Sequence, residues 1–141
     1  MDPDKTISKG KAERDKSEKI TINIGLVDLG EIDLLVDEGF FANRTDFIRT
    51  AIRRQLESRS SAVDRTVARR ELTLGSAYYS RHDLEQVRAS GTTVQLRVLG
   101  LATIADDVSP ELALATIDAV EVLGAFRAPA AVKAALASRT T

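Results

Sequence analysis

The 141-residue chain has no cysteine, a single histidine and no long apolar run, and each absence excludes a class of function. Without cysteine, neither a disulfide framework nor a Cys-based zinc or redox site can form. His82 alone cannot supply a multi-histidine metal site. No stretch of 18 or more apolar residues occurs, and the charged N-terminus lacks the apolar core of a secretory signal. We therefore expect a cytoplasmic protein without a membrane span, metal or cofactor.

The groups that enzymes use are equally scarce. Tyr78, Tyr79 and His82 form a polar aromatic cluster, but no nucleophile, second histidine or paired carboxylate accompanies them. Asp106 and Asp107 precede a Val-Ser-Pro helix start, and we interpret them as helix caps rather than a cation site. No Gly-rich phosphate loop is present. The sequence therefore predicts a protein that is not an enzyme.

What the chain does contain is a strong charge asymmetry within a globular composition. Hydrophobic residues make up 43% of the sequence and charged residues 29%, which is typical of folded domains. Residues 42–70 carry eight arginines against three acidic residues, whereas residues 71–141 carry six basic and eight acidic residues. A clustered positive field beside a mildly acidic body favours a nucleic-acid-binding protein. A solvated, Arg-rich helix is the alternative on charge alone.

Hydrophobic periodicity changes sharply near residue 19. Residues 1–18 hold almost no apolar side chain and are predicted to be a flexible, charged arm. The segment KITINIG then alternates, with isoleucines on one side and Lys19, Thr21 and Asn23 on the other, as a half-buried strand requires.

Two helices are predicted after this strand. Asp28 followed by Glu31 suggests a capping-box start, so we expect the first helix over about residues 29–38, ending before Gly39. Asn43 is a predicted N-cap with Asp46 three residues on. It opens a second helix with one apolar stripe, formed by Phe47, Ile48, Ala51, Ile52 and Leu56.

This order of strand, helix and Arg-rich helix, KITINIG, VDLGEIDLLVDEGFF and NRTDFIRTAIRRQLESR, resembles the ribbon-helix-helix DNA-binding family of the Arc, MetJ and CopG type. About 40 residues are too few for a self-sufficient core, and a lone strand has two open edges, so the unit is expected to pair with a second copy. The resemblance implies an intertwined homodimer whose two-stranded ribbon enters the major groove of double-stranded DNA.

The same resemblance implies the site residues. Lys19, Thr21 and Asn23 face outward from the ribbon and are the expected base-reading residues. Lysine donates to guanine, asparagine bonds adenine, and threonine offers a hydroxyl and a methyl. The start of the second helix, at Asn43, Arg44 and Thr45, is the expected phosphate-binding site, which agrees with the anion preference of helix N-termini.

The second half of the chain contains an internal repeat. Leu74-Gly75, Leu99-Gly100 and Leu123-Gly124 are spaced 25 and 24 residues apart, each after a strand-like stretch and before a helix-like one. Val and Leu follow the second and third glycines at offsets of 8 and 12 residues, and the first copy keeps only the later position, Val87. We predict strand-turn-helix units stacked like the coils of a solenoid, with the leucines in register beside glycine turns and the Val/Leu positions in one core.

The predicted fold is thus α+β, with four parts. They are a flexible arm (1–18), a ribbon-helix-helix domain for DNA binding and dimerisation (19–60), a basic linker (61–70), and a three-copy repeat module (71–141) for higher assembly or for binding a protein partner. The leading hypothesis is a homodimeric transcriptional repressor of the CopG type, associated with the nucleoid. The alternative is a structural scaffold or DNA-segregation adaptor that oligomerises through its repeats.

Overall fold

The computed structural model describes residues 17–141, so the predicted flexible arm lies almost entirely outside the described residues. The described chain is α+β and divides into two compact units, Ser17–Thr66 and Val67–Thr141. No helix in this part of the chain is long and apolar enough to cross a membrane.

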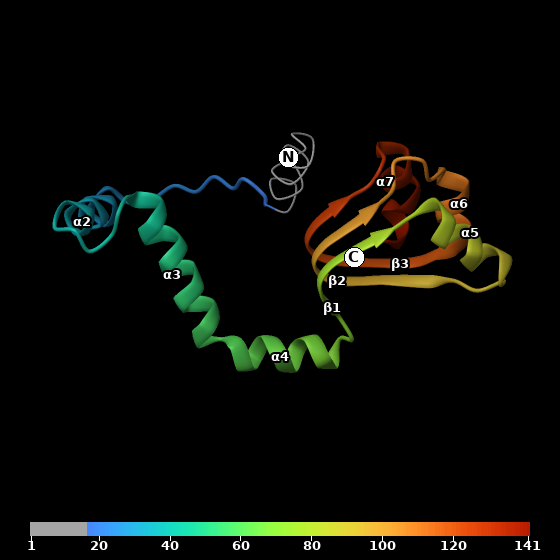
Figure 1. The fold of residues 1–141 in the computed structure, drawn as a ribbon, viewed down its shortest axis with the longest axis horizontal. Coiled ribbons are helices and arrows are strands. Elements are labelled where there is room, and N and C mark those ends of the chain that lie inside the picture. The colour runs from blue at the N-terminus through green and yellow to red at the C-terminus, as the bar shows by residue number, and fades with distance from the viewer. Residues whose placement is uncertain (1–16) are drawn as a thin grey trace, which may run out of the picture. The chain divides into compact units, whose positions relative to one another are not determined.

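The first unit contains helices α2 (Leu26–Asp37) and α3 (Arg44–Ser58) and the beginning of α4 (Ser60–Arg69), which continues into the second unit (Figure 1). Residues 19–25, where the sequence predicts a strand, lie in neither a helix nor a strand. A strand is defined by hydrogen bonds to a neighbour, and the single chain offers none at this segment. The two-stranded ribbon therefore stays a prediction. Helix α4 occupies most of residues 61–70, which were predicted to be a basic linker.

Helix α2 begins earlier than the capping pattern predicts. Its N-cap is Gly25, whose carbonyl oxygen accepts a hydrogen bond from the Leu29 backbone N–H at 2.9 Å. Asp28 lies inside the first turn. Its negative charge there stabilises the helix by interacting with the positive end of the helix dipole, and its side chain does not act as the cap. The prediction that Asp28 starts this helix was wrong. The predicted end is confirmed, since Gly39 follows the helix with a φ of 82°.

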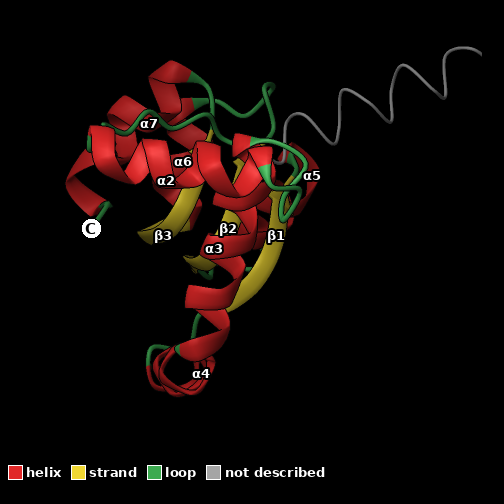
Figure 2. Ribbon diagram, turned by 90° about the vertical axis from the view of Figure 1, so that its left-hand side faces the viewer, coloured by secondary structure: helices red, strands yellow, loops and turns green. Residues whose placement is uncertain are grey.

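The second unit alternates strands and helices. Its elements in chain order are β1 (Thr73–Tyr79), α5 (Arg81–Ala89), β2 (Val94–Ile104), α6 (Pro110–Thr116), β3 (Ile117–Arg127), α7 (Ala130–Leu136) and the short 3-10 helix η1 (Ala137–Arg139). The three strands are parallel and adjacent in the order β1-β2-β3 (Figure 2). Every strand is therefore followed by a helix that returns the chain to the start of the next strand or closes the unit.

The repeated Leu-Gly pairs stack as predicted, but they do not form turns. Leu74 aligns with Leu99 and Leu99 with Leu123, and the glycines that follow them align in the same way. The strands run straight through these glycines, whose φ values lie between 115° and 137°. A Cβ on Gly100 would lie 2.1 Å from the Gly75 carbonyl oxygen. Glycine is thus needed here for close strand contact, and the predicted glycine turns were wrong.

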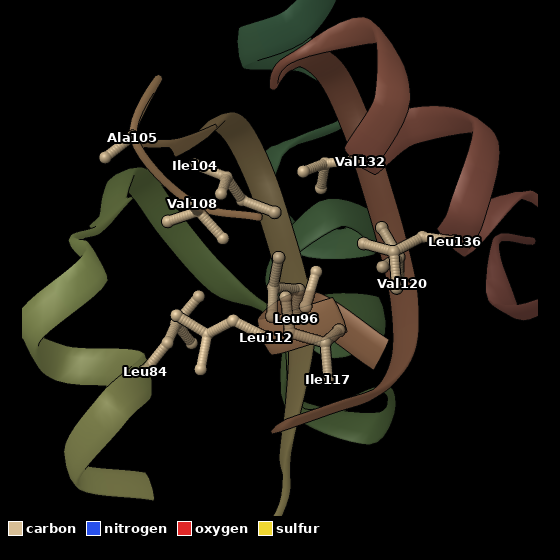
Figure 3. Close-up of a cluster of buried hydrophobic side chains, with 11 residues drawn as sticks. Leu84, Leu96, Ile104, Ala105, Val108, Leu112, Ile117, Val120, Val132 and Leu136 are labelled. Atoms are coloured by element: carbon tan, nitrogen blue, oxygen red, sulfur yellow. The ribbon is translucent and has the colours of Figure 1, made fainter. Parts of the chain in front are cut away.

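The core of this unit lies between one face of the sheet and the helices (Figure 3). Val108 and Leu112 from the second repeat and Val132 and Leu136 from the third are all buried there, as their common offsets predict. In the first repeat, the buried residue is Leu84, whereas Val87 is only partly buried. The stacked leucines lie on the opposite face of the sheet, since Leu74 is 71% exposed.

The prediction that Asp106 and Asp107 cap helix α6 was wrong. Asp106 and Asp107 occupy a turn after β2, and the N-cap of α6 is Ser109, whose hydroxyl accepts from the Leu112 backbone N–H at 3.1 Å. Ser109 directly precedes the helix, so its hydroxyl reaches the backbone of the first turn. Asp106 and Asp107 lie two or more residues further back and do not cap the helix. Across residues 17–141, no group of three or more acidic or His/Cys side chains is placed to hold a metal ion.

Candidate nucleic-acid interface

The start of helix α3 leaves two backbone amides available. Asn43 is the N-cap, as predicted, and its side-chain oxygen accepts from the Asp46 N–H at 2.8 Å. The Asp46 carboxylate in turn accepts from the Ala42 N–H at 2.9 Å. No hydrogen bond in residues 17–141 uses the backbone N–H groups of Arg44 and Thr45. Unpaired amides at a helix N-terminus form a site that can bind one phosphate oxygen.

The Arg44 side chain is paired within the unit. Its guanidinium donates two hydrogen bonds to the Asp33 carboxylate on α2, at 2.7 and 2.8 Å. This bond and the charge of Arg44 hold the pKa of Asp33 below its ordinary value, and the pKa of Arg44 is raised by the same pair. Both side chains are about half exposed. The bidentate pair fixes α2 against the start of α3 and neutralises Arg44 beside the amides.

The three predicted base-reading residues are solvent exposed. Lys19, Thr21 and Asn23 lie in the segment before α2, and no hydrogen bond or ion pair joins them to Asn43, Arg44 or Thr45 within residues 17–141. Two of the isoleucines that alternate with them are exposed as well, Ile20 by 76% and Ile22 by 63%, whereas Ile24 is partly buried. Both sides of the segment therefore face solvent in the single chain.

Helix α3 carries exposed cations beyond its first turn. Arg49, Arg53 and Arg54 are exposed, and no salt bridge to them occurs in the described part of the chain. The later part of the apolar stripe of the same helix is also uncovered, with Ile52 exposed by 48% and Leu56 by 59%. The helix therefore has one cationic surface available to a polyanion and one apolar surface without a partner.

The first unit has almost no interior of its own. Ile32 is the one buried side chain in residues 17–66. A hollow of about 270 Å³ lies between α2 and α3, lined by Ile32, Leu35 and Phe47 with Asp28 and Glu31 at its side. Phe41 makes an edge-on contact with Phe47, with 5.0 Å between the ring centres. So little burial cannot offset the entropy of ordering about 50 residues.

Comparison with known protein families agrees with this geometry. The sequence matches the Ribbon-Helix-Helix transcriptional regulator family over residues 15–133, which is more than half of the chain. The chain belongs to this family. No curated protein and no solved structure matches the chain.

The family match extends well beyond the segment that the sequence motifs indicate. The ribbon-helix-helix resemblance rests on residues 19–58, whereas the family match reaches into helix α7 and includes the whole parallel sheet. The sheet unit therefore belongs to the family pattern. It is not an unrelated addition to residues 19–58.

One residue of this site was missed by sequence reasoning. Asp33 lies 11 residues before Arg44 and has no motif around it. The pair forms because the turn at Gly39 folds α2 back toward the start of α3. The only signal in the sequence was an acidic residue on a helix that precedes an arginine-rich one, which is too common to identify a partner.

Proposed function

We propose that this chain is a homodimeric, sequence-specific DNA-binding protein that regulates transcription as a repressor, without enzymatic activity. The observation that carries the proposal is the exposure of alternating Ile and polar residues before α2, next to a family match for ribbon-helix-helix regulators. Bound to chromosomal DNA, it would act at the nucleoid in the cytoplasm.

The dimer accounts for the missing interior of the first unit. Two KITINIG segments paired antiparallel would satisfy each other's backbone groups and turn Ile20, Ile22 and Ile24 toward the helices. The hollow lined by Ile32, Leu35 and Phe47 and the uncovered stripe of α3 supply apolar surface for those side chains. Burying them against a second copy would provide the hydrophobic stabilisation that one copy lacks.

The same pairing places the polar residues for DNA reading. Lys19, Thr21 and Asn23 of both copies would lie on the solvent side of the ribbon and contact base edges in the major groove. The amides of Arg44 and Thr45, with the Asn43 cap, would hold a backbone phosphate, and Arg49 and Arg53 would add positive charge. In this proposal, phosphate contacts position the dimer and the ribbon provides sequence choice.

Residues 71–141 form a solenoid-like module for assembly or for binding a protein partner in this proposal. The parallel strands in sequential order and the shared register of the Leu-Gly pairs support stacked repeats.

Hydrogen exchange tests the ribbon directly. Amides of residues 20–24 have no strand partner in one copy, so their slow exchange in the assembled protein would report ribbon pairing. Ile22→Asp would bury an unpaired charge and is expected to return these amides to fast exchange. Thr21→Asp, on the other side of the strand, is the matched control and should keep them protected. Fast exchange of residues 20–24 in the unaltered protein would contradict the dimer.

The Asp33–Arg44 pair gives a second test, on affinity. Asp33→Asn removes a negative charge beside the phosphate site and releases the Arg44 guanidinium, so we expect tighter binding to every DNA sequence. Arg44→Ala leaves the Asp33 carboxylate unpaired beside the phosphate site, so it should weaken binding to all sequences, and the slope of log affinity against log salt should become shallower by about 0.9 for each phosphate contact that is lost. Fluorescence anisotropy at several salt concentrations measures both effects. If neither variant changed affinity or slope, the start of α3 would lie off the DNA.

A further inference from the structure

Strand β1 is an edge strand whose outer side has no neighbour in residues 17–141. The opposite edge is partly covered, because Val120 of β3 bridges Thr140 and its carbonyl oxygen accepts from the Thr141 N–H at 3.0 Å. Soluble proteins usually protect open edges with charge, proline or a bulge. The sequence of β1, TLGSAYY, has neither a charged residue nor proline. The backbone groups of this edge are therefore available to another strand.

Gly75 also leaves this edge sterically open. A Cβ on Gly124 would lie 2.1 Å from the Gly100 carbonyl oxygen, and a Cβ on Gly100 would lie equally close to that of Gly75. The Cβ position of each glycine thus points along the sheet at the preceding strand. Gly75 has a similar φ of 115°, and nothing lies within 4 Å of its Cβ position. A further backbone can approach β1 on this side without an obstacle.

The exposed apolar side chains of β1 are arranged symmetrically. Leu74 is 71% exposed and Tyr78 65% exposed, and Ser76 lies midway between them. All three point away from the helix-covered face, because their neighbours Ala77 and Tyr79 are the partly buried ones. In an antiparallel pair centred on Ser76, Leu74 of each copy would lie opposite Tyr78 of the other. The pair would then contain two such contacts between Leu74 and Tyr78, which cover the exposed side chains of both copies.

We propose that β1 pairs antiparallel with β1 of a second copy of this chain, centred on Ser76, and joins two three-stranded sheets into one. The symmetry of Leu74 and Tyr78 about Ser76 selects a second copy, because an identical strand supplies the complementary side chain at each position. The proposal rests on the proposed function in one respect. The ribbon dimer would raise the effective concentration of one β1 edge around another.

A single introduced cysteine tests the pairing in the full-length protein, which has no native cysteine. In Ser76→Cys, the two sulfurs would belong to directly opposed residues, whose Cα atoms lie about 4.5–5.5 Å apart in an antiparallel pair. This separation suits a disulfide. Mild oxidation is expected to give a covalent dimer on a non-reducing gel. Ser76 is exposed and serine and cysteine are similar in size, so the substitution should not disturb folding.

Thr73→Cys is the matched control on the same strand. Thr73 is also exposed, but six residues would separate the two cysteines along the paired strands, about 20 Å at 3.4 Å per residue. It should give only the background of random collisions. Equal linking of the two variants would overturn the pairing. So would linking of Ala125→Cys, at the same level on β3, in place of Ser76→Cys, because it would indicate sheets stacked face to face or a partner at the other edge.

The Ser76→Cys variant also distinguishes a failure of the β1 pairing from a failure of the proposed function. Specific DNA binding without a Ser76→Cys link would overturn the β1 pairing and leave the regulator intact. A Ser76→Cys link in a protein that binds no DNA specifically would overturn the proposed function and support the pairing.

Discussion

Replacing Lys19, Thr21 and Asn23 together with alanine is expected to abolish sequence-specific DNA binding while leaving general DNA binding in place. Each good base contact contributes about 1–3 kcal/mol of discrimination. Removing three of them from each copy, six in the dimer, costs about 6 kcal/mol at the lower end, which corresponds to a roughly ten-thousandfold weaker Kd for the specific site. The phosphate-binding groups at the start of α3 are untouched, so affinity for unrelated DNA should change far less.

Competition binding measures this difference. The variant and the unaltered protein are titrated onto a labelled specific site in the presence and absence of unrelated duplex, and circular dichroism checks that the helices are intact. All three side chains are exposed in the single chain, so their truncation should not unfold it. If the triple variant still selected the same site, base reading would belong to another surface.

Gly100→Ala is expected to destabilise the sheet unit strongly. The φ of Gly100 is 137°, a conformation that costs a residue with a side chain about 1–3 kcal/mol. The new Cβ would also lie 2.1 Å from the Gly75 carbonyl oxygen, which must move, and such overpacking costs about 1–3 kcal/mol more. The free energy of unfolding of a domain is only about 5–15 kcal/mol, so this destabilisation is large.

Two other glycines provide controls in urea unfolding. Gly75→Ala carries a similar backbone penalty, but its Cβ would overlap no atom of the chain, since nothing lies within 4 Å of that position. It should therefore lower the free energy of unfolding less than Gly100→Ala does. Gly30→Ala, inside α2 with open space around it, should stabilise its helix by about 1 kcal/mol. Equal destabilisation by Gly75→Ala and Gly100→Ala, in protein too dilute for β1 to pair with a second copy, would mean that the glycine rows are not in close backbone contact.

Among features that depend only on neighbours in the sequence, the Asn43 cap and the Gly39 stop were predicted well, whereas the helix starts assigned to Asp28 and to Asp106 and Asp107 were wrong. The Asn43 cap and its bond to Asp46 need only four consecutive residues, and the stop at Gly39 needs only one residue with positive φ. The register of Leu74, Leu99 and Leu123 also followed from the repeat spacing.

Features that depend on distant contacts were not predictable in the same way. The Leu-Gly pairs look like turns in sequence, yet the strands continue through them because an adjacent strand contacts each glycine at close range. The pairing of Asp33 with Arg44 depends on how α2 folds back toward α3, which no local pattern specifies. The predicted ribbon requires hydrogen bonds from a second chain, so one chain alone neither forms nor disproves it.

Selection of genomic fragments by the purified full-length protein tests the central claim most directly. The protein is mixed with sheared DNA from its source organism at moderate salt, and the retained fragments are sequenced and compared with the input. We predict enrichment of a short palindromic or tandemly repeated motif, which the Lys19/Thr21/Asn23 alanine variant no longer enriches. Retained fragments that share no motif, or a motif that the variant enriches equally, would contradict a regulator that reads DNA through its ribbon.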